Sequence, residues 1–286
     1  MSDRKGRIDQ FESVFRSADK TIFRLRPIHF KHILMITDQP RREIETLITE
    51  AKRFLGPVEE NDNPAWSILA QDDVHSFDEC RSQIDAANPD LVVAWRNLFD
   101  PVGSSVYSLG VFVDELTQYL RPPVLLLPDP KMMIPERAIE EVMVVTNKLT
   151  GEDRLVSKGV HFTPSDGRLI LCHIEDEDTF DRYMHAIERI PEIDSEKART
   201  LIREQLLKEP DDYITSCIKA IGEAGHSFTV ESVVEFGRGV GAFKRIMKEK
   251  EVDLMIFYTK DEAQIAMNGT AYSLAVEIRD IPLLML

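Results

Sequence analysis

The chain has 286 residues, a net charge of −15 at pH 7 and a hydrophobic share of 43%. This share is high enough for buried cores and argues against a disordered chain. The acidic excess argues against a general binder of nucleic acids or anionic membranes, because phosphate contacts need clustered Lys and Arg. No apolar run reaches membrane-spanning length, and the three cysteines (Cys80, Cys172 and Cys217) are scattered, as is typical of buried thiols in a reducing compartment. We therefore expect a cytoplasmic protein with neither a nucleic-acid nor a membrane partner.

The leading arm, residues 1–28, differs in charge from the rest of the chain. Residues 1–31 hold eight Lys/Arg and four Asp/Glu, so this end is basic while the remainder is acidic. Apolar residues within Ile8–Ala18 recur on one side of a helical pattern, which predicts a surface helix. Two interpretations stay open: a plain surface helix, or a segment that docks on the acidic body or on a partner subunit.

The next segment, residues 29–130, reads as an α/β domain. Helical patterns separate four short apolar runs, and this alternation predicts a parallel sheet with right-handed crossovers. The predicted strands are Ile33–Thr37, Ala65–Ala70, Leu91–Trp95 and Val124–Leu127, and the predicted helices lie near residues 40–55, 77–87 and 110–120.

A proline-rich linker at residues 128–137 leads to a second domain at residues 137–286. Its predicted strands are Val142–Thr146, Leu169–Ile174, Val230–Val234, Leu254–Phe257 and Leu283–Leu286. Gly151, Gly159 and Pro164 disfavour a first crossover helix within residues 150–166, and residues 178–225 read as helical material interrupted at Pro191 and Pro210.

The second domain repeats the first. Gly110 and Gly269 are each followed 13 residues later by a proline and a short apolar run. Asp90 matches Asp253 at an offset of 163, whereas the heads of the two copies match at an offset of 109. The difference of 54 residues is extra sequence in the second copy, and it predicts that Leu169–Ile174 has no counterpart in the first.

The order of these motifs resembles a tandem universal stress protein. The resemblance rests on Ile36–Asp38 at the end of the first strand, and on Leu171–Glu175, Glu223–His226, Val252–Ile256 and Asn268–Thr270 through to Leu286. It implies two tandem doubly wound, mostly parallel, Rossmann-like sheets of strand order 3-2-1-4-5, with the first copy shortened. It also implies that the final strands of the copies pair, as an intramolecular pseudo-dimer or in a homodimer.

The resemblance further implies a nucleotide site at the ends of strands one and four of each copy. ATP-binding members mark it with Gly-x2-Gly-x9-Gly-Ser/Thr and with an Asp after strand one. The second copy keeps Gly269 and Thr270 but has Asn147 in place of that Asp, whereas the first copy keeps Asp38. Neither copy has the full motif, so ATP and AMP are candidate ligands of an incomplete site.

Two further motifs have competing interpretations. Gly237, Gly239 and Gly241 precede a predicted helix, where an anion could bind beside Arg238, but turn glycines that allow tight packing explain the pattern as well. The acidic run Glu175–Asp178 fits either a divalent cation site or, preferably, a solvated loop.

No nucleophile, base or metal-ligand spacing stands out, so we expect no catalytic residue and no resident metal. We expect a stress or regulatory protein that acts mainly by contact with an unidentified protein partner and is modulated by adenine nucleotide. One alternative is an ATP/AMP-binding sensor with weak ATPase activity. Another is an enzyme of the adenine-nucleotide hydrolase-like fold, such as a relative of electron-transfer flavoproteins.

Overall fold

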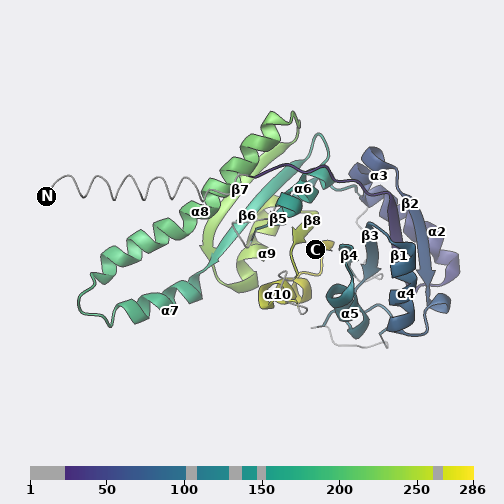
Figure 1. The fold of residues 1–286 in the computed structure, drawn as a ribbon, viewed down its shortest axis with the longest axis horizontal. Coiled ribbons are helices and arrows are strands. Elements are labelled where there is room, and N and C mark those ends of the chain that lie inside the picture. Colours follow the sequence, from purple (N-terminus) through teal and green to yellow (C-terminus); the bar gives the residue numbers. More distant parts are fainter. Residues whose placement is uncertain (1–22, 101–107, 129–136, 147–152, 260–266) are drawn as a thin grey trace.

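A computed structural model describes residues 23–100, 108–128, 137–146, 153–259 and 267–286. In these ranges one nine-stranded sheet runs through the molecule in the order β2-β1-β3-β4-β9-β8-β5-β6-β7 (Figure 1). All neighbouring strands are parallel except β4 and β9. The strands are β1 (His32–Thr37), β2 (Ala65–Ala70), β3 (Leu91–Trp95), β4 (Val124–Leu127), β5 (Glu141–Val145), β6 (Arg168–Asp176), β7 (Thr229–Gly237), β8 (Leu254–Phe257) and β9 (Leu283–Met285).

The helices cover both faces of the sheet, because the buried strand residues alternate between two apolar cores. Ile33 and Met35 of β1 belong to one core, and Leu34 and Ile36 to the other. The first core is closed by α2 (Arg41–Phe54), α3 (Gly56–Asp62), α6 (Asp153–Phe162) and the second half of α8 (Ser195–Glu223). The second core is closed by α4 (Phe77–Ala87), α5 (Val111–Tyr119), α9 (Gly239–Lys250) and α10 (Gly269–Glu277). The remaining elements are α7 (Glu177–Ile187) and the short 3-10 helix η1 (Gln71–Asp73).

The strand order confirms the predicted fold class. In the second copy β7-β6-β5-β8-β9 is the order 3-2-1-4-5, and the first copy has the shortened order β2-β1-β3-β4. The two expected sheets are joined into one. The boundaries at 29–130 and 137–286 stay predictions, and the predicted helix at 8–18 and most of the linker lie outside the described residues.

The unmatched strand of the second copy is β7, not the strand at Leu169–Ile174 as predicted. β2 pairs along the whole length of β1, as β6 pairs along β5. β2 therefore takes the place of β6, although its sequence aligns with β7. In its described residues, the first copy lacks one crossover unit. β2 therefore pairs directly with β1, because no other described strand occupies that edge of β1.

The pairing of β4 with β9 relates the copies by an approximate twofold axis. Leu125 lies opposite Leu284, its own equivalent in the repeat, and Val124 lies opposite Met285. Such self-opposed pairing is the mark of an isologous interface, here formed within one chain. The final strands therefore pair inside the molecule, as the intramolecular form of the resemblance implies.

Equivalent aspartates hold the start of each copy. In the first copy the N–H groups of Lys31 and His32 donate to Asp90 Oδ2 at 2.7 and 3.0 Å. In the second copy the N–H groups of residues 140 and 141 donate to Asp253 Oδ2 at 3.0 and 2.9 Å. The donors of the two copies differ by 109 in residue number and the aspartates by 163, so this one arrangement contains both offsets of the repeat.

Two helices differ from the sequence expectation. α6 forms although it contains Gly159. This glycine lies against β5, where a Cβ would overlap with Val144, so its small size lets the helix pack closely on the sheet. α8 continues through Pro210 without interruption. Tyr213, Ile214 and later residues of α8 are buried against the sheet, and this packing stabilises the helix although the proline removes one hydrogen bond.

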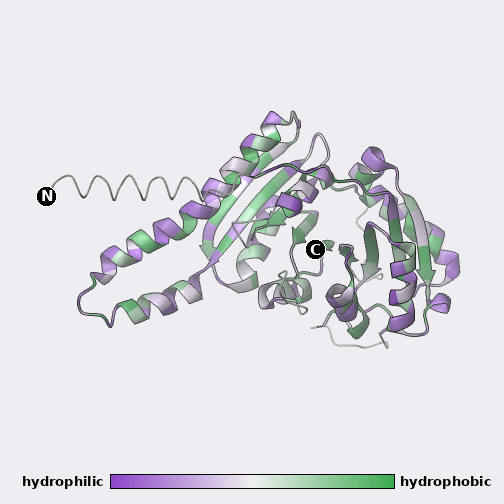
Figure 2. Cartoon of the chain, in the orientation of Figure 1, coloured by the Kyte–Doolittle hydropathy of each residue, from purple (hydrophilic) through white to green (hydrophobic). Residues whose placement is uncertain are grey.

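Part of the extra sequence of the second copy forms a helical hairpin, which we define as residues 177–208. It comprises α7 and the first half of α8, and it projects from one end of the sheet (Figures 1 and 2). Pro191 lies in the connection between the two helices, as predicted. In the described part of the chain, no helix is long and apolar enough to cross a membrane.

Replacing Asp90 or Asp253 by alanine should lower the free energy of unfolding by roughly 1–3 kcal/mol, because two backbone N–H groups then lose their acceptor. Urea denaturation measures the loss. Asp85→Ala is the control, since this exposed carboxylate pairs with Arg81 on the surface and should matter by less than about 1 kcal/mol. Equal stability of all three variants would show that Asp90 and Asp253 do not hold the start of each copy.

Candidate functional site

In the first copy, the predicted site residue Asp38 is hydrogen-bonded within the chain. Asp38 follows β1, and its two carboxylate oxygens accept hydrogen bonds from Gln39 Nε2 at 2.7 Å and from Phe99 N–H at 3.3 Å. The loop after β3 turns sharply, with φ of 54° at Asn97 and 60° at Phe99. Asp38 therefore holds this loop in place.

The same loop places the carboxylate of Asp100 beside Gly110, at the start of α5. Gly110 caps the start of α5 with φ of 92°, and a Cβ there would lie 2.6 Å from Asp100 Oδ2. Burial and the neighbouring Asp100 raise the pKa of Asp114 in the first turn of α5. A negative charge is favourable at a helix N-terminus, and here the chain supplies it. Only glycine fits at position 110, because any side chain would displace Asp100.

The predicted site in the second copy is partly open. Asn268 caps α10, since its Oδ1 accepts a hydrogen bond from Ala271 N–H at 2.8 Å. Its backbone N–H donates to Thr259 O at 2.7 Å, which ties the cap to the end of β8. Gly269 and Thr270 are exposed, and a Cβ at Gly269 would meet open space. Asn147 and the loop at 260–266 lie outside the described residues.

The glycine cluster after β7 serves packing and the turn at two of its three positions. A Cβ at Gly237 would lie 2.5 Å from Ala242 Cβ, and Gly239 has φ of 52°. Gly241 meets neither constraint. Arg238, the candidate anion ligand, forms ion pairs with Glu177, Asp178 and Asp181 of α7. Its charge is therefore balanced within the chain.

The acidic run Glu175–Asp178 is divided between two elements. β6 ends at Asp176, whose side chain caps α7 by accepting a hydrogen bond from Thr179 N–H at 2.5 Å. Glu177 and Asp178 both pair with Arg238, and Glu177 also pairs with Arg203, so arginines already neutralise these carboxylates. Among the described residues no group of three or more His, Cys, Asp or Glu could hold a metal ion.

His173 and the cysteines are packing residues. His173 is buried, with Nδ1 2.8 Å from Thr146 O and Nε2 3.3 Å from Glu175 Oε2. All three cysteines are buried thiols. Burial raises the pKa of the Cys80 and Cys172 thiols to about 12, so neither is a reactive thiolate at neutral pH.

The fold also creates a cluster of titratable side chains around Asp62, which the sequence did not predict. The buried carboxylate of Asp62, at the end of α3, lies 2.7 Å from His161 Nε2 and 3.1 Å from His29 Nδ1. Phe30 N–H also donates to it at 2.8 Å. These groups border a cavity of about 710 Å³, between α3 of the first copy and α6 of the second. The residues are far apart in sequence, and no spacing signal links them.

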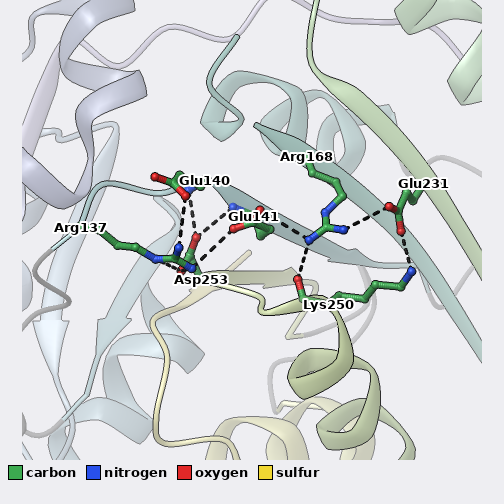
Figure 3. Close-up of polar contacts among 7 residues, drawn as sticks. All are labelled: Arg137, Glu140, Glu141, Arg168, Glu231, Lys250 and Asp253. Atoms are coloured by element: carbon green, nitrogen blue, oxygen red, sulfur yellow. Dashed lines mark hydrogen bonds and ion pairs between the residues drawn. The ribbon is translucent and has the colours of Figure 1, made fainter. Parts of the chain in front are cut away.

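An ion-pair network crosses the amino ends of four strands of the second copy (Figure 3). Arg168 joins Glu141 of β5 to Glu231 of β7, and its Nη2 also donates to Lys250 O at 2.9 Å. Hydrogen bonds, first from Lys250, lower the pKa of Glu231. The network links Arg137, Glu140, Glu141, Arg168, Glu231, Lys250 and Asp253 to one another. Because these charges are paired, the network is structural and offers no free charge to a ligand.

Arg96 fastens one copy to the other. Its side chain is buried, and Nη1 and Nη2 donate to the carbonyls of Ala275 and Ile278 at the C-terminal end of α10. Burial lowers the pKa of Arg96 to about 10, so it stays charged at neutral pH and complements the negative end of the helix. The helix that carries Gly269 is therefore anchored by the first copy.

The doubly wound, mostly parallel sheet defines the class of the protein as a Rossmann-like α/β fold. Similar solved structures include a universal stress protein from Archaeoglobus fulgidus DSM 4304, at 12% identity, with 89% of this chain and 97% of that chain covered and a TM-score of 0.49. A second, from Pseudomonas aeruginosa UCBPP-PA14, is assigned provisionally to the same family and has 13% identity, coverage of 89% and 81%, and a TM-score of 0.46. No family model and no curated protein matches the chain. Likenesses at these identities assign neither a ligand nor an activity.

Stability should fall as the pH drops through about 6.5, because burial lowers the pKa of His161 below 6.5 despite the opposing charge of Asp62. The unfolded chain then binds the proton first. His161→Gln should flatten the dependence of the unfolding free energy on pH between 8 and 5, whereas His185→Gln, at an exposed position on α7, should not. Parallel curves for all three proteins would contradict this.

Asp62 adds a second transition at lower pH. Burial alone would raise its pKa, but the hydrogen bonds from Phe30 N–H and His29 outweigh it and lower the pKa below 3.8. Its contribution to stability is therefore present above pH 3.8 and is lost as the pH falls below it.

Replacing Arg96 by methionine should lower the free energy of unfolding by roughly 2–4 kcal/mol, because two buried carbonyl oxygens lose their donors. Chemical denaturation checks the loss, and Arg81→Met, at an exposed surface pair, is the matched control. Full stability of Arg96→Met would show that α10 does not depend on this anchor.

Proposed function

We propose that this protein is a universal-stress-type regulatory protein that acts through contact with other proteins and not through turnover of a nucleotide. The observation that carries the proposal is the carboxylate of Asp100 against Gly110. It fills the helix N-terminus at which a bound phosphate would be expected, and a phosphate there would meet like charge.

The second copy supports the same proposal less strongly. The cap formed by Asn268 already uses one N–H group of the first turn of α10. The family-type loop that would supply further N–H groups lacks its two glycines. Arg238, which could have held an anion at the glycine cluster, is paired with acidic residues of α7.

One observation favours a second candidate, a sensor that binds ATP or AMP. Gly269 and Thr270 are exposed at the start of α10, with open space beside Gly269. A helix N-terminus in this state can accept a phosphate group. In this alternative the second copy alone would bind the nucleotide, and Thr270 would supply a hydroxyl group to it.

A thermal-shift measurement separates the two candidates. We expect no change in melting temperature with ATP or AMP, whereas a ligand at 100 times its dissociation constant would add about 2.7 kcal/mol. Gly269→Asp and Gly222→Asp form a matched pair, because a Cβ at either glycine would meet open space and Gly222 lies near the end of α8, outside the candidate sites. A shift with ATP that is lost in Gly269→Asp and kept in Gly222→Asp would establish the sensor and refute the proposed function.

A further inference from the structure

The helical hairpin carries most of the large apolar side chains that are exposed in the described part of the chain. Tyr183 is 60% exposed, Ile190 44%, Ile193 42% and Leu201 53%. The other three, Val111, Tyr119 and Tyr272, lie on α5 and α10. Single exposed apolar residues need no explanation, but four on one projecting element mark a contact surface.

The part of the chain that the structure describes, which begins at residue 23, leaves this surface uncovered. The fully buried residues of α8 all lie from Pro210 onward. In the first half of the helix, one side that includes Ile202 and Leu206 is half-buried, and the rest is exposed. In α7 only Phe180 and Met184 are buried. The hairpin therefore projects beyond the sheet, as Figure 1 shows, and is held at its base, where Phe180 of α7 packs on Phe236 of β7. Nothing in the described part of the chain covers its exposed apolar side chains.

The hairpin is also the part of this acidic chain with little net charge. Residues 177–208 hold eight Asp/Glu and six Lys/Arg, against 50 and 35 in the whole chain. Several of these charges are paired within the chain. Arg199 contacts Asp181 and Glu188, and Arg203 contacts Glu177.

From these features we infer that the hairpin binds the hairpin of a second copy of this chain. A basic partner would be drawn to the acidic body and not to this nearly neutral element. Two chains of charge −15 repel one another, but contact through projecting hairpins places the acidic bodies away from the interface, and salt screens charges that lie beyond a Debye length of about 8 Å. A stable interface uses roughly 20–30 residues a side, which is close to the size of the hairpin.

This inference deepens the proposed function, because it names one protein contact and its partner. It is tested separately, since self-association does not depend on whether a nucleotide binds. Sedimentation equilibrium of the full chain should show a species of twice the 32.7 kDa monomer mass. The association should strengthen from 50 to 500 mM NaCl, because salt screens the repulsion between the bodies.

The double variant Tyr183→Glu, Leu201→Glu should raise the dimer dissociation constant by about tenfold or more. Val111→Glu is the matched control, because Val111 is 70% exposed but lies on α5, away from the hairpin. Circular dichroism and urea denaturation should show both variants folded. Equal loss of association in the variant and the control would overturn the hairpin assignment.

A cysteine at Ile190 provides a second readout that does not depend on the charge variants. The native cysteines in the described residues are buried, so an oxidised dimer of Ile190→Cys would report on contact between hairpins. Cross-linking is expected for Ile190→Cys and not for Val111→Cys. A monomer at every salt concentration, association that weakens with salt, or equal cross-linking of the two cysteine variants would each refute the inference.

Discussion

The antiparallel pairing of β4 with β9 is the constraint on which the rest of the structure depends. Each of these strands is short, apolar and almost completely buried, and each would be an exposed edge if its copy stood alone. Their pairing makes one sheet of the two copies and lets both apolar cores run through the whole molecule. It also brings Arg96 within reach of α10 and α3 within reach of α6. The two halves therefore stabilise each other through the sheet and through both helical layers.

The copies have kept the geometry of the fold more faithfully than the chemistry of a pocket. Asp90 and Asp253 do the same structural work in the two halves, with hydrogen bonds of nearly equal length. The carboxyl ends of the strands differ instead. Asp100 lies beside Gly110 at the start of one helix, and Asn268 caps the other. A duplicated sheet can therefore remain intact while its ligand chemistry diverges. Asp90 and Asp253 bind the amino ends of the strands, whereas a phosphate is expected at the carboxyl ends.

The fold could be predicted from sequence to the level of strand order, because apolar runs, turn residues and the repeat are all local signals. The identity of the missing strand could not, since β2 aligns with β7 but pairs as β6 does. The site of the first copy could be predicted in part. The sequence identifies Asp100 and Gly110 as loop positions, but their contact depends on the left-handed backbone at Asn97 and Phe99. The Asp62 cluster could not be predicted from the sequence, because its residues come from three distant segments that only the folded sheet brings together.

The single insertion of the second copy also sets the valency of the molecule. The approximate twofold axis relates most elements of the two halves, but the hairpin has no counterpart in the described part of the first half. The described residues of each chain thus present one such surface and not two. An isologous contact through a single surface is satisfied when two chains have met, whereas two related surfaces would allow chains to add without end. The asymmetry that breaks the internal twofold therefore limits assembly through the hairpin to a closed pair.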